Sequence, residues 1–207
     1  GSEMCIRDSI IASQIEHKAI LNTCKALQQM GWDVTYLPVD KYGIVQPDDL
    51  QSAMRNNTRL VSIMLANNEV GTIEPIKTLA AVAHAGGALF HTDAVQAVGH
   101  IPVNVNELGV DFLSLSAHKF GGPKGMGALY AKDGAISSFV DGGGQEMGRR
   151  SGTENVPGII GTAVALMLAD GLMLHNAQKV RHLRDRIIDE LSSMDGVLVT
   201  GPDPGPM

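Results

Sequence analysis

The segment at residues 114–119, Ser-Leu-Ser-Ala-His-Lys, places a lysine directly after an apolar stretch and among small and hydroxyl side chains. At the end of a buried strand, the pKa of Lys119 would be lowered, and a neutral amine is what Schiff-base formation with an aldehyde requires. Ser116 and His118 are suitable hydrogen-bond donors for a phosphate beside that amine. The alternative is an ordinary surface lysine, because lysine is rarely buried. The surrounding pattern favours the Schiff-base interpretation of Lys119.

Asp93 is the second candidate, because it follows a predicted strand and stands among apolar and small neighbours. A carboxylate in such a place is costly unless a cation or hydrogen-bond donors pair with it. In a pyridoxal-phosphate enzyme that partner is the protonated pyridine nitrogen, which lets the ring accept electrons. The alternative is that Asp93 caps the turn containing Gln96, and the residue type alone does not decide between the two.

Other polar side chains could complete such a site. Asn68 and Gln96 can donate hydrogen bonds to the ring hydroxyl of the cofactor. His17, near the start of a predicted helix, could stack on the ring face or move protons. A lone histidine in that position is more often structural, so this assignment depends on the rest of the site.

A glycine-rich segment at residues 142–155 contains Arg149 and Arg150 and several hydroxyl side chains just before a helix. It is similar to an anion-binding loop, and the alternative is a mobile surface loop. Neither this segment nor residues 121–125 matches the glycine patterns that bind dinucleotides or nucleoside triphosphates. His84, His91 and His100 show no ligand spacing and are assigned to structure. The two cysteines, Cys5 and Cys24, are far apart and form no C-x-x-C pair, so no metal site is predicted.

The elements that must position these residues alternate along the chain. Strand patterns occupy residues 9–13, 33–38, 59–65, 89–92, 112–116 and 127–131, and helical patterns occupy 16–30, a segment from Pro47, and 76–85. Strands separated by helices predict an α/β fold with a mainly parallel sheet. Ligands in such sheets lie beyond the carboxyl ends of the strands. We therefore expect the polar groups at residues 67–69, 93–96 and 116–119 to converge on one edge.

The C-terminal third differs from this pattern. Residues 156–194 predict a long helix with a weak point at Asp170 and Gly171, followed by a strand at residues 196–200. This arrangement places a domain boundary near residue 172, so that residues 10–172 form a large domain and residues 173–207 begin a second one. Residues 1–9 show no periodicity and are interpreted as a leader or scar. The apolar run at residues 159–174 is interrupted, so no membrane-spanning stretch is predicted.

Composition excludes several classes of protein. Hydrophobic residues make up 44% of the 207 residues, which is enough for a sizeable core. The formal net charge is −6, and no cluster of lysine and arginine forms a basic stripe, which argues against a nucleic-acid or anionic-membrane partner. Two widely separated cysteines do not suggest a disulfide framework, so a reducing, cytoplasmic setting is expected.

Six motifs, in order and at matching spacing from about residue 9 to the last residue, resemble those of the cysteine desulfurases in the class V aminotransferase branch of fold-type I pyridoxal-phosphate enzymes. They are EHKA at 16–19, NNEVGT at 67–72, HTDAVQ at 91–96, SAHK at 116–119, GPKG at 122–125 and RSGTEN at 150–155. The second and last are most similar to the subgroup that serves iron–sulfur cluster assembly. The resemblance implies a large domain with a mainly parallel sheet flanked by helices, followed by the start of a C-terminal small domain.

The resemblance also implies roles for individual residues. Lys119 would hold pyridoxal 5'-phosphate as a Schiff base and take the α-proton of the substrate. Asp93 would pair with the pyridine nitrogen, and His17 would stack on the ring. The other implied cofactor contacts are Asn68 and Gln96 at the ring oxygen, Ser116 and His118 at the phosphate, and Thr153 at the phosphate of a neighbouring subunit.

The activity implied by the resemblance converts L-cysteine to L-alanine in a homodimer and passes sulfur, as a persulfide, to an iron–sulfur scaffold or another acceptor protein. The matching region covers about the middle half of a family member, and the phosphate-binding loop before the first strand is absent. The persulfide cysteine and the arginine that grips the substrate carboxylate are expected beyond Met207, and neither Cys5 nor Cys24 is assigned as nucleophile. Met147 stands where many relatives carry arginine.

These departures predict that the chain by itself is inactive as a desulfurase. Two alternatives stay open: another lyase or transaminase of the same branch, and a non-catalytic fragment of the fold.

Overall fold

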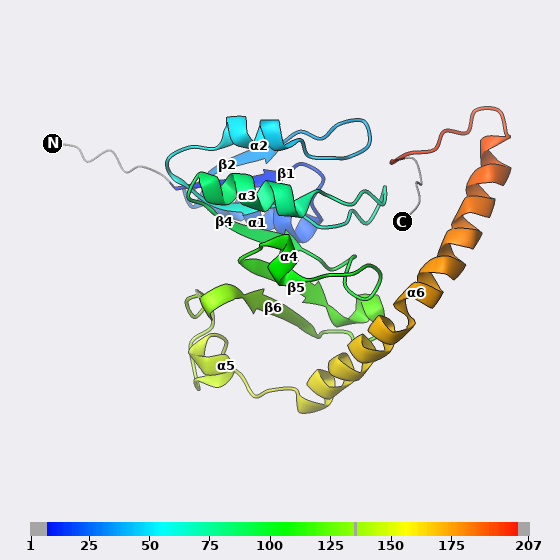
Figure 1. The fold of residues 1–207 in the computed structure, drawn as a ribbon. Helices are drawn as coiled ribbons and strands as arrows, with labels where there is room; N and C mark the ends of the chain where they lie inside the picture. Colours follow the sequence, from blue (N-terminus) through cyan, green and yellow to red (C-terminus); the bar gives the residue numbers. More distant parts are fainter. Residues whose placement is uncertain (1–7, 135, 203–207) are drawn as a thin grey trace.

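A computed structural model of the chain describes residues 8–134 and 136–202. Cys5, most of the predicted leader and the C-terminal residue Met207 lie outside the described residues. Figure 1 shows a central sheet with helices packed on it and one long helix that leads away from it.

The sheet has six strands in the order β2-β1-β3-β4-β5-β6. The first five strands in that order are mutually parallel, and β6 is antiparallel to β5. A mainly parallel α/β sheet is therefore confirmed, although the antiparallel edge strand was not predicted. In chain order the strands are β1 (Ser9–Ser13), β2 (Asp33–Leu37), β3 (Thr58–Ser62), β4 (Leu89–Asp93), β5 (Phe112–Ser116) and β6 (Gly127–Ala131).

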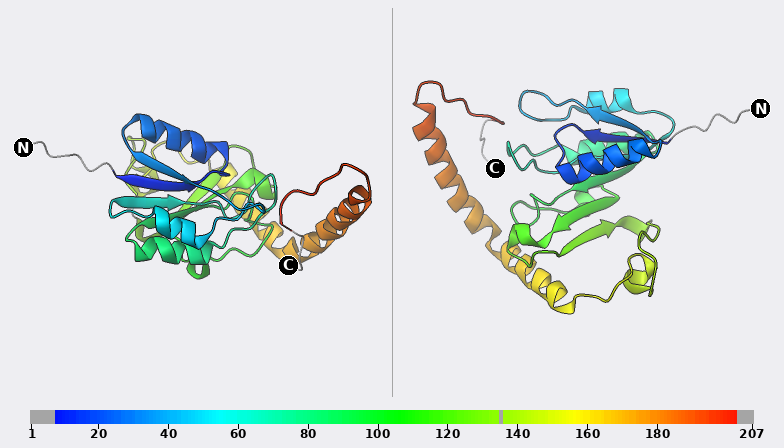
Figure 2. Two further views of the ribbon diagram at one scale, coloured as in Figure 1. Left: turned by 90° about the horizontal axis from the view of Figure 1, so that it is seen from above. Right: turned by 180° about the vertical axis from the view of Figure 1, so that it is seen from behind.

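Helices cover both faces of the sheet. Figure 2 shows α1 on one face and α2 and α3 on the other. The helices are α1 (Lys18–Gln29), α2 (Pro47–Ala53), α3 (Ile76–Ala85), α4 (Val105–Leu108), α5 (Gln145–Gly148) and α6 (Val156–Ser192), with short 3-10 turns η1 (Ala117–Phe120) and η2 (Lys132–Gly134).

The predicted helix boundaries follow local chemistry. Pro47 occupies the first turn of α2, where its missing N–H costs nothing. The helix α1 ends at Gln29 with Met30 as its C-cap, and Gly31 follows with φ +99°, a left-handed conformation that glycine adopts without strain. Gly87 has a similar conformation after α3. The predicted starts and stops of α1 and α3 and the predicted start of α2 are confirmed to within two residues.

The core lies between the sheet and the helices that flank it. Ile11, Val61 and Phe90, which are paired and share one face of the sheet, are fully buried, and Ile10 and Ala12 on the other face of β1 are buried as well. Strands with apolar side chains on both faces are typical of a sheet covered on both sides, because each face needs an apolar layer to pack against. This core fixes the strands whose ends carry the predicted site.

The long helix α6 differs from the sequence prediction in two ways. It continues without interruption through Asp170 and Gly171, where a weak point was expected. Residues 197–200 form no strand, and their side chains are exposed. A strand needs a hydrogen-bonding neighbour, and no described strand adjoins these residues, whatever their propensity.

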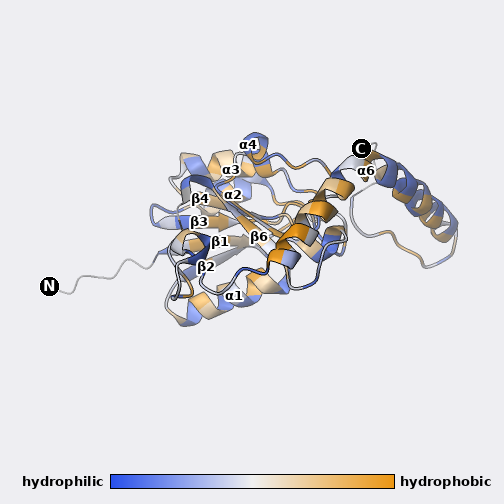
Figure 3. Cartoon of the chain, turned by 90° about the horizontal axis from the view of Figure 1, so that it is seen from below, coloured by the Kyte–Doolittle hydropathy of each residue, from blue (hydrophilic) through white to orange (hydrophobic). Residues whose placement is uncertain are grey.

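By length and composition α6 could cross a membrane, because an 18-residue window within it has a mean hydropathy of 1.7. The expectation that no stretch reaches membrane-spanning length was therefore wrong: it treated Asp170 and Gly171 as a break, whereas the helix runs through both. Figure 3 shows that the half of α6 nearest the sheet is the more hydrophobic.

Candidate functional site

The carboxyl ends of β3, β4 and β5 lie side by side at one edge of the sheet, because the three strands are adjacent and parallel. The pairing continues past β3, where the amide of Leu65 donates to the carbonyl of Asp93. Residues 93–96 and 116–119 begin at the last residues of β4 and β5, and residues 67–69 come shortly after Leu65, to which the pairing of β3 extends. The predicted convergence of the three polar loops on one edge is confirmed.

Asp93 is the last residue of β4, and its side chain is only 8% exposed. Its Oδ1 accepts a hydrogen bond of 2.9 Å from the amide of Val95. This bond is the turn-capping contact that was the alternative role for Asp93. A carboxylate has a second oxygen, so capping one turn does not prevent it from binding another donor.

Ser116 lies on the same face of the sheet as Asp93. Asp93 pairs with Ser114 on β5, and Ser116 follows two residues later, so the three side chains project to the same side. The hydroxyl of Ser116 is 2.8 Å from Nδ1 of His118. The two predicted phosphate ligands therefore contact each other directly.

Lys119 lies in η1, the turn that begins immediately after β5. Its side chain is exposed, so the burial that the sequence argument assumed for this amine is not provided by the described residues. That assumption failed because the strand ends at Ser116, and the 3-10 turn that follows buries Ala117 and Phe120 but leaves His118 and Lys119 exposed. The position still places an accessible amine beside the end of the strand that pairs with Asp93.

Two contacts fix η1 against the turn that follows Asp93. His100 Nε2 lies 3.0 Å from the backbone carbonyl of Lys119. Gly99 has φ +81°, and a Cβ there would stand 2.7 Å from Cβ of Phe120. This close approach requires glycine. The Asp93 turn and the Lys119 turn are thus held together by residues that were not predicted to matter for the site.

His91 connects three strands beneath Asp93. Its Nδ1 is 2.8 Å from the hydroxyl of Ser62 on β3, and its Nε2 is 2.9 Å from that of Ser114 on β5. Burial lowers the pKa of His91, and the negative charge of Asp93 opposes the shift only in part. His91 was expected to be structural, because it shows no ligand spacing. This row of hydrogen bonds agrees with that assignment and adds a support two residues from Asp93.

His17 and Asn68 are both exposed at this edge. His17 caps α1: its Nδ1 accepts a 3.1 Å hydrogen bond from the amide of Ala19. A nitrogen that accepts this bond carries no proton, so the ring proton of neutral His17 is on Nε2. Gln96 is half-buried in the turn after Asp93.

Glu16 and Asn67 are buried neighbours of these two residues and were singled out only as members of motifs. Glu16 is 5% exposed and Asn67 is 7% exposed. Burial raises the pKa of Glu16 to about 7, although hydrogen bonds from Ser13 and Met64 act in the other direction. The only signal in the sequence was the position of each residue directly before a predicted site residue, because the rare burial of a glutamate depends on the elements packed around it.

Thr153 is exposed in the segment between α5 and α6, away from the sheet edge described above (Figure 1). In the glycine-rich segment, Nη1 of Arg150 donates to the carbonyl of Ser151, so this guanidinium is partly engaged by its own loop. Met147 is 81% exposed and has φ +57°. Nothing in the structure explains methionine at this position.

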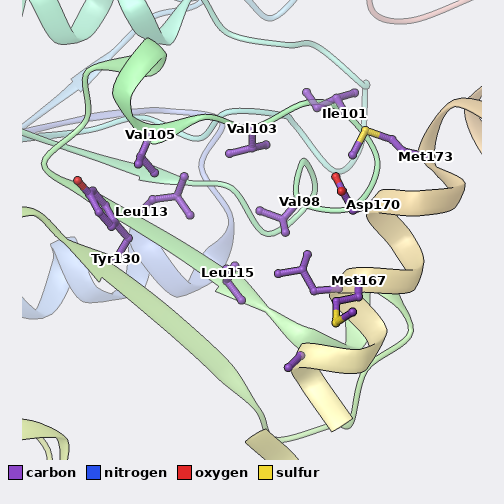
Figure 4. A pocket seen from close by; sticks show the side chains of 13 residues that line it. Val98, Ile101, Val103, Val105, Leu113, Leu115, Tyr130, Met167, Asp170 and Met173 are labelled. Atoms are coloured by element: carbon purple, nitrogen blue, oxygen red, sulfur yellow. The ribbon is translucent and has the colours of Figure 1, made fainter. Parts of the chain in front are cut away.

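An apolar cavity of about 570 Å³ lies elsewhere, between α6 and the side of the sheet formed by β5 and β6. Figure 4 shows Val98, Leu115 and Met167 lining it, with Asp170 as the charged side chain among the lining residues. None of the predicted site residues lines this cavity. It does not have the polar groups that a phosphorylated cofactor requires, so we place the candidate site at the sheet edge.

The residues at that edge match the chemistry of pyridoxal phosphate. The group needs an amine, a carboxylate for the pyridine nitrogen and donors for the phosphate. Lys119, the 8%-exposed Asp93 and the Ser116–His118 pair supply these from the ends of two neighbouring strands. The donor set therefore fits the cofactor.

Comparison with known families decides the assignment of this fold. The family described as Aminotransferase class-V matches residues 3–206 of the chain. The chain belongs to the class-V aminotransferases.

Individual relatives agree with this assignment. The class-V chain is 53% identical, over 195 residues, to a cysteine desulfurase IscS of Dictyoglomus turgidum; the match covers 93% of this chain and 50% of the relative. A solved structure described as a NifS-like protein is 42% identical, with a TM-score of 0.91 over 95% of this chain and 55% of that one. A structure of SspA in complex with cysteine is 43% identical, with a TM-score of 0.75 over 78% of this chain and 47% of that one. The chain spans about half the length of the curated relatives it matches.

Proposed function

We propose that this class-V chain is part of a pyridoxal-phosphate-dependent cysteine desulfurase. The reaction would convert L-cysteine and an acceptor thiol into L-alanine and an acceptor persulfide, for iron–sulfur cluster assembly. The observation that carries the proposal is the gathering of Lys119, Asp93 and Ser116 at one sheet edge, in a chain 53% identical to a cysteine desulfurase IscS. The similar SspA structure, which was solved with cysteine, supports cysteine as substrate.

Each residue would have a distinct task. When bound, pyridoxal phosphate supplies an electron sink for the bond to the substrate α-carbon. Lys119 would supply the amine that holds the cofactor and would take the α-proton at Nζ. Asp93 would keep a proton on the pyridine nitrogen, and its burial strengthens that interaction because the surrounding dielectric is low.

The other site residues would bind and orient the cofactor. Ser116 and His118, already in contact, would bind the phosphate together. Asn68 and the half-buried Gln96 would bind the ring oxygen. His17 would lie over the ring with its proton on Nε2, the tautomer that the α1 cap favours.

The proposal extends to assembly and location. Thr153 would reach the phosphate site of a second copy, which makes the functional unit a homodimer, and its exposure is compatible with that role. A cytoplasmic enzyme is proposed, and the unpaired, buried Cys24 is compatible with a reducing compartment. The net charge of −6 supports the absence of a nucleic-acid partner. The NifS-like match covers 95% of the chain, which supports α6 as part of the shared fold and not as a membrane span.

Cofactor attachment at Lys119 is the decisive test. The protein mixed with pyridoxal phosphate should develop an absorption band near the boundary of the ultraviolet and visible ranges. Borohydride reduction should then fix the cofactor on the peptide that contains Lys119, as identified by mass spectrometry.

The matched control is Lys124→Ala, because Lys124 is another exposed lysine in the following loop. Lys119→Ala should abolish the band, whereas Lys124→Ala should keep it. Labelling spread evenly over surface lysines, or a band that survives Lys119→Ala, would contradict the proposed site.

A further inference from the structure

Glu16 links two segments that lead into the candidate site. Its Oε1 accepts hydrogen bonds of 2.7 Å from the hydroxyl of Ser13, at the end of β1, and of 2.7 Å from the amide of Met64, just past β3. Both bonds are buried, and Glu16 is 5% exposed. The residue immediately after Glu16 is His17, so these bonds fix the chain at the point where it enters the site.

Asn67 makes a second link between the same segments. Its Nδ2 donates to the carbonyl of Ile15 at 3.0 Å, and its Oδ1 accepts from the amides of Glu69 and Val70 at 2.8 and 2.9 Å. The residue immediately after Asn67 is Asn68. One side chain therefore ties the loop before His17 to the turn that contains Asn68.

We propose that Glu16 and Asn67 together form a buried brace, and that Glu16 is a positioning residue which, through this brace, holds His17 and Asn68 in register at the cofactor edge. The proposal rests on the proposed pyridoxal-phosphate function, because only a bound ring requires those two exposed side chains to keep a fixed separation. Neither Glu16 nor Asn67 is assigned to touch the cofactor. Their effect reaches it through the residue that follows each of them.

The geometry explains why a buried acid occupies this position. The Ser13 hydroxyl and the Met64 amide both need a hydrogen-bond acceptor, and one carboxyl oxygen of Glu16 accepts from both. The other oxygen, Oε2, is buried without a hydrogen-bond partner among the described residues. Burial, with a smaller contribution from the charge of Asp93, raises the pKa of Glu16 to about 7. Glutamine, which keeps the acceptor oxygen and has no charge, is therefore the conservative replacement.

Glu74 provides a control whose side chain bonds to another segment, although its backbone amide donates to the carbonyl of Leu65, at the base of the turn that contains Asn68. It is 3% exposed, its Oε2 accepts from the amide of Val45 at 2.9 Å, and its Oε1 is also buried without a partner among the described residues. Burial raises the pKa of Glu74 to about 7 as well. Val45 leads into α2 and not into the candidate site. Glu74→Ala should thus reproduce the loss of stability without the loss of positioning.

The first arm of the test uses cofactor-free protein and NMR spectroscopy. In Glu16→Ala, the Met64 amide should exchange at least about tenfold faster than in the wild type, because its buried acceptor is gone. The imidazole resonances of His17 should shift at the same time. Glu16→Gln should restore both, and Glu74→Ala should leave both unchanged while the Val45 amide loses protection. A Met64 amide or His17 ring that does not respond to Glu16→Ala would overturn the brace.

The second arm measures the dissociation constant for pyridoxal phosphate by absorbance. Glu16→Ala should raise it by about tenfold, whereas Glu16→Gln and Glu74→Ala should stay within about threefold of the wild type. Equal weakening by Glu16→Ala and Glu74→Ala would overturn the positioning role, because stability alone would then explain the effect. If the wild type shows no cofactor band, the proposed function fails, and the NMR arm still decides whether the brace holds His17.

Discussion

The N-terminal and C-terminal parts of this molecule differ in how far their apolar side chains are buried. In the parallel part of the sheet, β1 to β5, apolar residues such as Ile11, Val61 and Phe90 are fully buried, and polar ones such as Glu16 and His91 are hydrogen-bonded. From β6 onward the pattern reverses. Apolar side chains are exposed on β6, in the following loop and along most of α6; they include Leu129, Phe139, Val156, Ile160, Met167, Leu168 and Leu174.

This difference shows that the candidate site depends on the well-packed part of the fold. Asp93, Lys119 and Ser116 lie at the ends of β4 and β5, each of which is paired with a strand on both sides. Only the first half of α6 contacts the core, through side chains such as Ala165, Leu166 and Ala169. A large exposed apolar surface usually marks a contact with another protein or another part of the same protein.

The largest effect is expected from a matched pair of phenylalanine substitutions. Phe90→Ala in β4 should lower the free energy of unfolding by about 3–5 kcal/mol, because it removes a fully buried ring and leaves a cavity. Phe139→Ala, where the side chain is 95% exposed, should change it by less than about 0.5 kcal/mol. Denaturant titrations followed by circular dichroism measure both. Similar losses for the two variants would remove the contrast between the regions.

The second prediction concerns the pH dependence that the well-packed region should show. The pKa values of Glu16 and Glu74 are raised by burial from 4.5 to about 7, so between these pH values the folded protein binds more protons than the unfolded chain. The free energy of unfolding should therefore fall as pH rises from 4.5 to about 7, and level off above that. His91 acts in the opposite direction, since burial lowers its pKa and its contribution is lost as pH falls below 6.5.

Comparing the wild type with a variant that lacks both carboxyl groups isolates the contribution of Glu16 and Glu74 to the pH dependence. Urea titrations across this pH range should give a smaller downward slope for the double variant Glu16→Gln and Glu74→Gln than for the wild type. The contribution of His91 is the same in both proteins and cancels in the difference. Identical slopes would show that the two carboxyl groups are not buried as described.

The smallest effect is expected at two glycines with opposite signs. Gly171 lies within α6 in open space, so Gly171→Ala should stabilise the helix by about 0.5–1 kcal/mol. Gly31 has φ +99° at the end of α1, so Gly31→Ala should destabilise the protein by about 1 kcal/mol. Thermal melts followed by helical circular dichroism measure both. A lower helical signal for Gly171→Ala than for the wild type would contradict a continuous helix at this position.

Sequence patterns predicted much of the fold because local chemistry sets many boundaries. Pro47, Gly31 and Gly87 mark helix ends through backbone properties of their own, and the structure confirms them. Sequence patterns gave wrong predictions where the secondary structure of a segment depends on the elements packed beside it. Residues 196–200 have strand-like composition but no described strand beside them, and Asp170 and Gly171 interrupt a hydropathy pattern without interrupting a helix.

For the candidate site, too, some features follow from the sequence and others only from the tertiary structure. The identities of Lys119, Asp93 and Ser116 and their positions at strand ends are properties of the sequence, because alternating strands and helices give a parallel sheet whose loops gather at one edge. Only the tertiary structure shows what holds that edge together: the bonds of Glu16 and Asn67, the His91 row and the close approach at Gly99. These contacts join residues far apart in the chain. The physical reason is that a side chain's burial and partners depend on the elements packed against it, which no local pattern encodes.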